Sequence, residues 1–238
     1  MKTIFHPADQ RGHANHGWLD AHHSFSFANW YDPSRVHFGM LRVLNDDIVA
    51  AGQGFGMHPH NDMEIITIIL EGALEHRDSM GNGSVIRPGD VQVMSAGSGV
   101  MHSEFNPSKT ERTNLFQIWI FTKEDGIQPR YDQKSFDPAQ RKNSFQLVAS
   151  GLKKKDELYI HQNAAISLSQ LDKNTAIEYQ MQRAGNGAYF MVIDGSVTID
   201  GKTLSRRDAI GVWDTAAVNI QANDSSNLIV IEVPMTDN

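Results

Sequence analysis

The feature that most constrains the fold is a succession of short apolar runs separated by Gly, Pro, Asn and Asp turns. Residues 38–45 read as a strand, and residues 63–70 and 115–121 are rich in β-branched and aromatic side chains, which is typical of strands. Such runs recur at intervals of about ten residues, and a long pattern with the 3.6-residue period of a helix is not evident. The sequence therefore predicts an all-β fold, a sandwich or a barrel, with few short helices.

The length of 238 residues allows one large β domain or two domains of about 120 residues. A weak internal repeat favours two. Leu-Glu-Gly-Ala-Leu at 70–74 resembles Ile-Asp-Gly-Ser-Val at 193–197, each an apolar strand, an acidic-Gly turn and a return strand. Residues 122–143 are polar and rich in turn residues, which indicates a surface connector. We therefore predict an N-terminal lobe at 1–135 and a C-terminal lobe at 136–238.

Composition excludes several classes of function. The net charge of −7 argues against a nucleic-acid-binding surface. The absence of cysteine removes disulfides, thiolate metal sites and cysteine nucleophiles, and leaves His and carboxylates as metal ligands. No apolar run reaches the length of about 18 residues needed for a membrane span, and the first residues do not resemble a signal peptide. A cytoplasmic protein without membrane contacts is expected.

Histidines are concentrated in the first half, since all of the eleven except His161 lie at or before position 102. In a strand, residues i and i+2 point to the same face. His58 and His60 can therefore aim at one point, and so can His102 and Glu104. Both pairs lie beside glycine-rich turns in β-type sequence. Three imidazoles and one carboxylate converging in this way predict a mononuclear metal site.

The internal repeat gives the C-terminal lobe a different character. A gapless overlay of the two lobes puts Met181 and Arg183 opposite the His58–His60 pair, and Ile220 and Ala222 near the positions of His102 and Glu104. The C-terminal lobe is therefore predicted to lack metal ligands. Single histidines in strands are usually structural, and we assign that role to the histidines at positions 6, 13, 16, 37, 76 and 161. His22 and His23 are adjacent, so at most one of them can line a cavity.

Several motifs together resemble a known family. The His58-x-His60-x3-Glu64 pattern, with Gly72 and a later His102, resembles the two-part cupin signature. Over the first half the chain closely resembles the pirin family, and within it the bacterial pirin-like quercetin 2,3-dioxygenases. The second half resembles the family more weakly. The segments that carry the resemblance are RGHANHGWLD at 11–20, GFGMHPH at 54–60, LEG at 70–72, PGDVQ at 88–92 and SAGSGVMHSE at 95–104.

The resemblance implies two consecutive cupin lobes, each a jelly-roll β-barrel, with a metal in the N-terminal lobe only. It also implies the ligand set His58, His60, His102 and Glu104. In the general cupin pattern the carboxylate ligand is at the position of Glu64. Strand parity leaves both carboxylates open, because Glu64 shares the even register of His58 and His60. The compact His102-x-Glu104 pair and the pirin pattern favour Glu104.

Nitrogen and oxygen donors suit Fe(II), Mn, Co, Ni, Cu or Zn, and ligand softness does not choose among them. The family resemblance makes Fe(II) the first choice. Four protein ligands would saturate a tetrahedral structural zinc site, whereas an octahedral metal ion would keep two open positions. Open positions suit an oxygenase, because a substrate and O2 can then bind side by side.

The resemblance therefore implies a dioxygenase that uses O2 to open the ring of a flavonol such as quercetin, with release of CO and with Glu104 as the base for the flavonol hydroxyl. One alternative is a non-enzymatic, redox-sensing regulator that binds a protein partner. Another is a purely structural metal. A monomer is expected. The apolar side chains that would accept a flat aromatic substrate, although core packing explains each equally well, are Phe25, Phe27, Met57, Met101 and Phe105.

Overall fold

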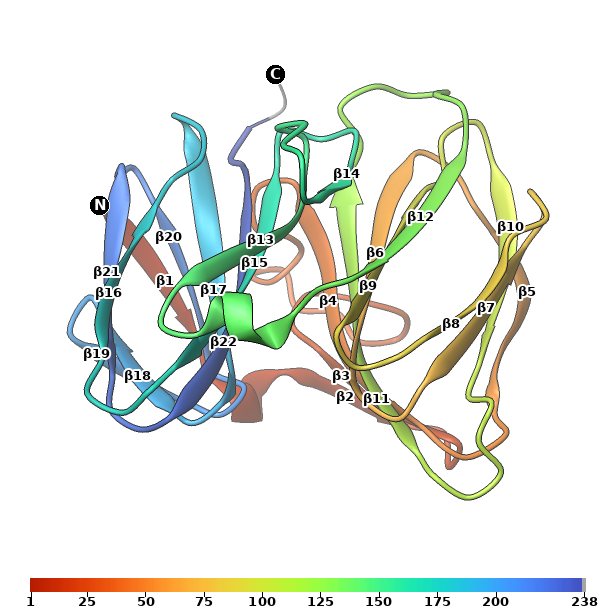
Figure 1. Cartoon of the computed structure of the whole chain (residues 1–238), viewed down its shortest axis with the longest axis horizontal. Helices are drawn as coiled ribbons and strands as arrows, with labels where there is room; N and C mark the ends of the chain where they lie inside the picture. Colours follow the sequence, from red (N-terminus) through yellow and green to blue (C-terminus); the bar gives the residue numbers. More distant parts are fainter. Residues whose placement is uncertain (237–238) are drawn as a thin grey trace.

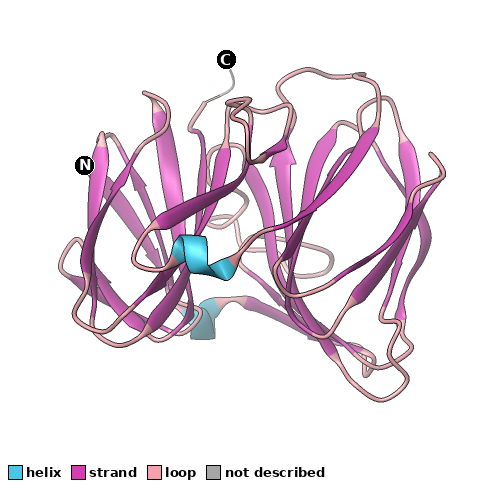
Figure 2. Cartoon of the chain, viewed as in Figure 1, coloured by secondary structure: helices cyan, strands magenta, loops and turns pink. Residues whose placement is uncertain are grey.

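The computed structural model describes residues 1–236 and has two β lobes side by side (Figure 1). Each lobe combines a seven-stranded sheet with a four-stranded sheet. Strands dominate the described chain, and its two helices are short 3-10 turns at Ala8–Gln10 and Pro138–Arg141 (Figure 2). The prediction of a two-lobed, all-β fold is confirmed. In the described part of the chain, no helix has the length and apolar character needed to cross a membrane.

The N-terminal lobe is built from antiparallel strands. Its larger sheet has the order β12-β9-β6-β11-β4-β3-β2 and its smaller sheet the order β5-β10-β7-β8. The strands of the larger sheet are β2 (Gly12–Asn15), β3 (Leu19–His23), β4 (Leu41–Val49), β6 (Met63–Glu71), β9 (Asp90–Ser95), β11 (Thr113–Phe121) and β12 (Arg130–Ser135). Those of the smaller sheet are β5 (Gly54–His60), β7 (Leu74–Asp78), β8 (Gly83–Ile86) and β10 (Val100–Phe105).

The C-terminal lobe repeats this arrangement, with sheet orders β1-β20-β17-β22-β15-β13-β14 and β16-β21-β18-β19. The strands of the larger sheet are β1 (Lys2–His6), β13 (Phe145–Ser150), β14 (Leu158–Tyr159), β15 (Ala165–Leu171), β17 (Asn186–Asp194), β20 (Ala209–Trp213) and β22 (Ser226–Pro234). Those of the smaller sheet are β16 (Ala176–Gln180), β18 (Ser196–Ile199), β19 (Lys202–Ser205) and β21 (Ala217–Ala222).

The repeat found in the sequence lies at the same place in both lobes. Gly72 joins β6 to β7 and Gly195 joins β17 to β18, with φ angles of +78° and +90°. A Cβ atom there would lie 2.5 Å from the carbonyl oxygen of Arg112 or 2.3 Å from that of Ser225. Both turns therefore require glycine, because the backbone is left-handed and the neighbouring strand is close.

The lobe boundary predicted between residues 135 and 136 falls between β12 and the second 3-10 helix. The first strand, which the sequence assigned to the N-terminal lobe, pairs with β20 and lies in the sheet of the other lobe. Figure 1 shows β1 in red among the blue strands. The division into 1–135 and 136–238 as domains stays a prediction, and residues 237–238 of the second range lie outside the described part.

Buried apolar side chains cluster between the two lobes and inside each of the two barrels. The largest core lies between the two seven-stranded sheets, where Ile66, Ile68 and Phe116 of one lobe meet Ile166 and Ile229 of the other. A second core fills the C-terminal barrel. The N-terminal barrel instead holds two smaller apolar clusters. Polar side chains are buried in the same barrel, among them Thr67, His76, Gln92, His102 and Glu104.

Local sequence patterns are misleading at two places. Residues 24–27 alternate polar and apolar side chains, as a half-buried strand would, but β3 ends at His23 and the following segment is a turn in which the Ser26 amide bonds to the Arg35 carbonyl. The predicted connector at 122–143 contains β12, which pairs with β9 at the edge of the sheet. Edge strands tolerate polar sequences, because one side of the strand faces solvent and little apolar packing is required.

Candidate metal centre

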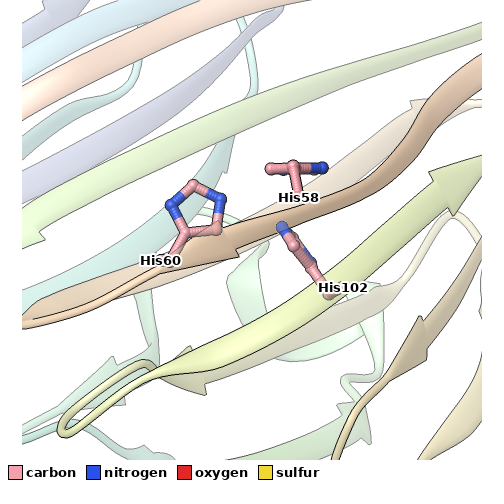
Figure 3. Close-up of side chains that lie close together, drawn as sticks. All are labelled: His58, His60 and His102. Carbon is pink, nitrogen blue, oxygen red and sulfur yellow. The ribbon is translucent and has the colours of Figure 1, made fainter.

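Three histidines converge on one point at the junction of β5 and β10. His58 and His102 are directly opposite each other in the antiparallel register, and His60 lies two residues along β5. The ring centroids are 4.4 Å apart for His58 and His102, and 4.9 Å apart for each of the other two pairs. Figure 3 shows the three rings gathered over the two strands. One ligand atom from each ring lies within 4.8 Å of the other two.

The hydrogen bonds of these histidines leave nitrogen atoms available to a metal ion. His58 Nδ1 lies 2.8 Å from the carbonyl oxygen of Gly56 and donates to it, so Nε2 carries the free lone pair. His102 Nε2 is buried and has no hydrogen-bond partner among the described residues. Buried polar atoms normally have partners. A metal ion at this point would satisfy His102, so the residues present fit a metal site.

Two of these imidazoles are neutral at neutral pH. Burial, with the nearby His58, lowers the pKa of His60 to about 4. Burial and the neighbouring histidines lower the pKa of His102 to about 2. Metal ions bind the neutral form of imidazole. The barrel therefore holds these two rings in the form that coordinates a metal.

Glu104 lies on β10 two residues beyond His102, after a register shift between the two strands. Its carboxylate is 3% exposed and accepts hydrogen bonds from Gln117 Nε2 at 3.2 and 3.1 Å. Burial raises its pKa to about 7, against the opposing effect of the bonds from Gln117 and Thr67. Glu104 forms a second group of close ligand atoms with His76 and His102. It therefore adjoins the three-histidine group through the shared His102.

Glu64 points elsewhere. Asp62, with φ of +46°, lies in the turn that separates β5 from β6, and the two strands belong to different sheets. The Glu64 carboxylate accepts a 2.8 Å hydrogen bond from Ser95 Oγ through Oε2, and its buried Oε1 has no hydrogen-bond partner among the described residues. The sequence argument that Glu64 shares the register of His58 and His60 was wrong, because strand parity does not continue through a turn.

His76 was assigned a structural role from the sequence, and the structure places it beside the centre. Its Nδ1 lies 3.5 Å from Nδ1 of His102, its Nε2 lies 3.2 Å from Oδ2 of Asp78, and its ring stacks on Tyr131 at 4.6 Å. The Asp78 carboxylate therefore contacts His76, and His76 in turn contacts His102. The alternation of β7 could have identified His76 from the sequence, since residues 74, 76 and 78 share the inward face of the strand.

An apolar cavity of about 220 Å³ opens beside the histidines. His58, His60 and Glu104 form part of its wall, and its apolar lining comes from Leu19, Ala21, Phe27, Phe55 and Trp119. A larger hollow of about 480 Å³ at the lobe junction is lined by other residues, including Lys153 and Arg183. The smaller cavity is the one that combines the histidine group with an apolar wall.

The predicted cavity walls were mostly wrong. Of the five apolar residues proposed from the sequence, Phe27 lines the cavity and Phe25 packs in the core between the lobes. Met57, Met101 and Phe105 are 53%, 44% and 39% exposed. Each of these three is next in sequence to an inward-facing candidate ligand and so points outward. Of the adjacent pair at 22 and 23, His23 alone lines the cavity, as strand alternation requires.

Asp47 also lines the cavity, although no sequence motif marks it. Its side chain is buried, and Oδ1 has no hydrogen-bond partner in the described structure. Burial, with the nearby Asp46 and Glu104, raises the pKa of Asp47 well above its usual value. A carboxylic acid that stays neutral can donate a hydrogen bond to a ligand oxygen.

Three of the four overlaid positions in the C-terminal barrel carry apolar side chains, and the fourth is Arg183. Ile220 and Ala222 on β21 are buried in its core with Tyr179, and Met181 packs against that core. Within residues 1–236, each group of side chains close enough to hold a metal ion belongs to the N-terminal lobe. The contrast agrees with the overlay drawn from the sequence.

Comparison with known proteins gives consistent matches. The Pirin family model matches residues 4–120, and the model of the quercetinase C-terminal cupin domain matches residues 147–233. The quercetin 2,3-dioxygenase of Escherichia coli K12 is 48% identical over 227 residues, which cover 95% of this chain and 96% of that protein. A pirin-like protein of Caulobacter vibrioides is 41% identical, covering 95% and 97%.

Solved structures agree with these matches. The crystal structure of YhhW from Escherichia coli has a TM-score of 0.94 and 46% identity and covers all of both chains. A structure of the bacterial pirin YhhW in complex with nickel(II) has a TM-score of 0.92 and 45% identity, covering 98% of this chain and 99% of that one. The histidine group, the family models and the nickel-bound relative together support a metal site in this chain.

Proposed function

This chain belongs to the pirin family, and from that premise we propose that it is a metal-dependent dioxygenase that opens the ring of flavonols such as quercetin with O2 and releases CO. The observation that carries the proposal is the group of three imidazoles with a buried carboxylate beside it, at an apolar cavity whose wall includes His58, His60 and Glu104. Relatives named quercetin 2,3-dioxygenase that align over almost the whole chain support the same activity.

We assign the metal to His58, His60, His102 and Glu104. The unpartnered Nε2 of His102 and the oriented ring of His58 support this assignment. Four ligands leave two open positions on an octahedral ion, and Fe(II) is our first choice among the ions that nitrogen and oxygen donors accept. The nickel complex of a relative makes Ni(II) the strongest competitor.

When bound, the metal ion supplies Lewis acidity that lowers the pKa of the flavonol 3-hydroxyl. Glu104 is placed to take the hydroxyl proton, because its carboxylate adjoins the histidine group and also lines the cavity. Its pKa of about 7 matches the operating range of a general base. Gln117 orients the carboxylate through two donated contacts to its oxygens.

The cavity holds the reacting part of the substrate. Phe27, Phe55 and Trp119 provide flat apolar surfaces for an aromatic ring. The volume of about 220 Å³ is below the range of about 300–1,000 Å³ typical of ligand pockets, so part of a three-ring flavonol would extend to the mouth. Burial raises the pKa of Asp47 well above its usual value, and in its protonated form the carboxyl group would donate a hydrogen bond to a substrate oxygen.

One observation favours the alternative of a metal-containing regulator that binds a protein partner. Met57, Met101 and Phe105 expose apolar surface on the outward faces of β5 and β10, the two strands that carry the histidines. A partner bound there would be sensitive to the state of the metal centre. Exposed apolar groups near functional strands often mark interaction sites. The cytoplasmic location and the monomeric state stay predictions from the sequence.

The test is an assay of quercetin with the metal-loaded protein. Protein loaded with Fe(II) under anaerobic conditions is mixed with quercetin and O2, and loss of flavonol absorbance is followed together with CO. We expect turnover in the wild type, its loss in His58→Ala, and its retention in the control His161→Ala. Full metal occupancy without turnover of any flavonol would contradict the proposal and favour the regulator. A large loss of melting temperature on chelation, again without turnover, would favour a structural metal.

A further inference from the structure

Both faces of strand β3 carry side chains that could bind a ligand. Leu19, Ala21 and His23 line the cavity beside the metal centre. Asp20 and His22 alternate with them and therefore lie on the opposite face. His13 on β2 is directly opposite His22 in the antiparallel register, which puts both imidazoles on that outer face. The outer face thus carries two histidines and a carboxylate that the flavonol site does not use.

These three side chains lie close together. His13 Nε2 is 2.7 Å from Oδ1 of Asp20, and His22 Nδ1 is 4.0 Å from the same oxygen. The two rings stack with centroids 4.5 Å apart and planes at 20°. One ligand atom from each of the three residues lies within 4.8 Å of the other two. A hydrogen bond to Asp20 accounts for His13 alone, because 4.0 Å is beyond hydrogen-bond range for His22.

The spacing suits a metal ion after small side-chain rotations. Ligands about 2.0–2.1 Å from a tetrahedral ion lie about 3.3–3.4 Å from one another, between the shortest and longest separations of this group. The side chains of His13, Asp20 and His22 are 52%, 38% and 33% exposed. An ion can therefore enter from solvent, and water can complete its coordination. Two imidazoles and a carboxylate suit Zn²⁺, Ni²⁺ or Cu²⁺ better than Mg²⁺ or Ca²⁺.

We propose that His13, Asp20 and His22 form a second, solvent-accessible site for a divalent transition-metal ion, separate from the centre inside the barrel. The ion would cross-link β2 to β3 at the edge of the seven-stranded sheet. Because β3 also forms a wall of the cavity, the ion would hold that wall in place from its outer face. Each chain would then bind two metal ions with different accessibility.

Zn²⁺ alone is the probe for this site. The metal-stripped full-length chain is equilibrated with Zn²⁺, and bound zinc per chain is measured after dialysis. We expect two equivalents in the wild type and in His161→Ala, which changes a histidine outside both groups. His13→Ala and His22→Ala should each bind one equivalent, and His58→Ala should keep the outer one. In ¹H–¹⁵N spectra of the imidazole rings, the signals of His13 and His22 should shift with one of the two equivalents.

A nearly isosteric variant guards against damage to the hairpin. Asp20→Asn keeps the size of the side chain and removes its charge, and we expect it to weaken the outer site at least tenfold while the thermal melting of the metal-free chain is unchanged. The proposal is overturned if His13→Ala and His22→Ala bind as much zinc as the wild type, or if His58→Ala binds none. Neither result depends on flavonol turnover, so this test is independent of the proposed enzymatic function.

Discussion

His58 and His102 lie directly opposite each other on β5 and β10, with their ring centroids 4.4 Å apart. The pairing of two strands from distant parts of the sequence thus creates half of the metal centre. His60 follows by alternation along β5, and Glu104, the proposed fourth ligand, comes after the register shift in β10. The centre depends on strand register, and a slip of one residue would turn each of these side chains to the opposite face.

The choice of carboxylate ligand gives the first prediction. Glu104→Gln keeps the shape of the side chain and removes the charge, so metal affinity should fall by more than the roughly 10–100-fold expected for loss of a residue behind a ligand. Glu64→Gln should leave the affinity unchanged, because Glu64 bonds to Ser95 and lies on β6, in a different sheet from the strands that carry the histidines. Competition titrations with a chelator measure both. The reverse order of effects would identify Glu64 as the ligand.

The pH dependence of metal binding follows from the raised pKa of Glu104. The carboxyl group is protonated below its pKa of about 7 in the metal-free chain and must lose that proton to bind a metal. Metal affinity should therefore fall about tenfold for each pH unit below about 7, with release of about one proton per ion. His60 and His102, with pKa values of about 4 and about 2, add little above pH 5.

Calorimetry in buffers of different ionisation enthalpy measures the released proton. Above pH 7 the proton release should approach zero, because Glu104 is already ionised in the metal-free chain. Glu104→Gln is the matched control and should lose the pH-dependent release. An affinity that stays constant from pH 5 to pH 7 would show that Glu104 does not titrate on metal binding.

A third prediction concerns His76, which contacts His102 through their Nδ1 atoms and bonds to Asp78. His76→Phe keeps the ring that stacks on Tyr131 and removes both nitrogen atoms. We expect metal affinity to fall about 10–100-fold, because His102 loses the group that orients it. Tyr131→Phe is the control, since it retains the stacked ring and should retain the affinity. Equal metal affinities in the wild type and in His76→Phe would show that His76 contributes packing and does not orient His102.

A fourth prediction tests the cavity as the substrate site. Ala21 is 2% exposed in the structure and lines the cavity opposite the outer face of β3. Ala21→Leu fills part of the space of about 220 Å³, so the KM for quercetin should rise at least tenfold while metal content is unchanged. Ala176→Leu, at an exposed position in the other lobe, is the control. Unchanged kinetics in Ala21→Leu would place the substrate elsewhere.

Much of the fold could be predicted because local signals agree with it. The apolar run at 63–70 became β6, and the acidic-Gly turn recurs in both lobes. Pairing across lobes has no local signal, which is why the position of β1 in the C-terminal sheet was missed. The edge strand β12 was missed for a related reason, since a polar edge strand has the composition of a loop.

The candidate site shows a similar limit. Alternation within one strand correctly paired His58 with His60, and the same rule applied to β7 would have found His76. The rule failed for Glu64 because the turn at Asp62 separates it from His60. Asp47 lies on β4, far from the motif in the sequence, and only the three-dimensional arrangement brings it to the cavity. Spacing in the sequence therefore predicts which side chains share one face of a strand. It does not predict which residues of other strands lie beside them inside the barrel.

Anomalous X-ray diffraction from crystals of the metal-loaded chain, recorded on both sides of the absorption edge of the metal, tests the central claim most directly. We expect a strong peak in the N-terminal barrel, about 2.0–2.2 Å from nitrogen atoms of His58, His60 and His102 and from an oxygen of Glu104. A weaker peak between β2 and β3 would leave that claim intact. A principal peak beside Glu64, or inside the C-terminal barrel, would contradict it.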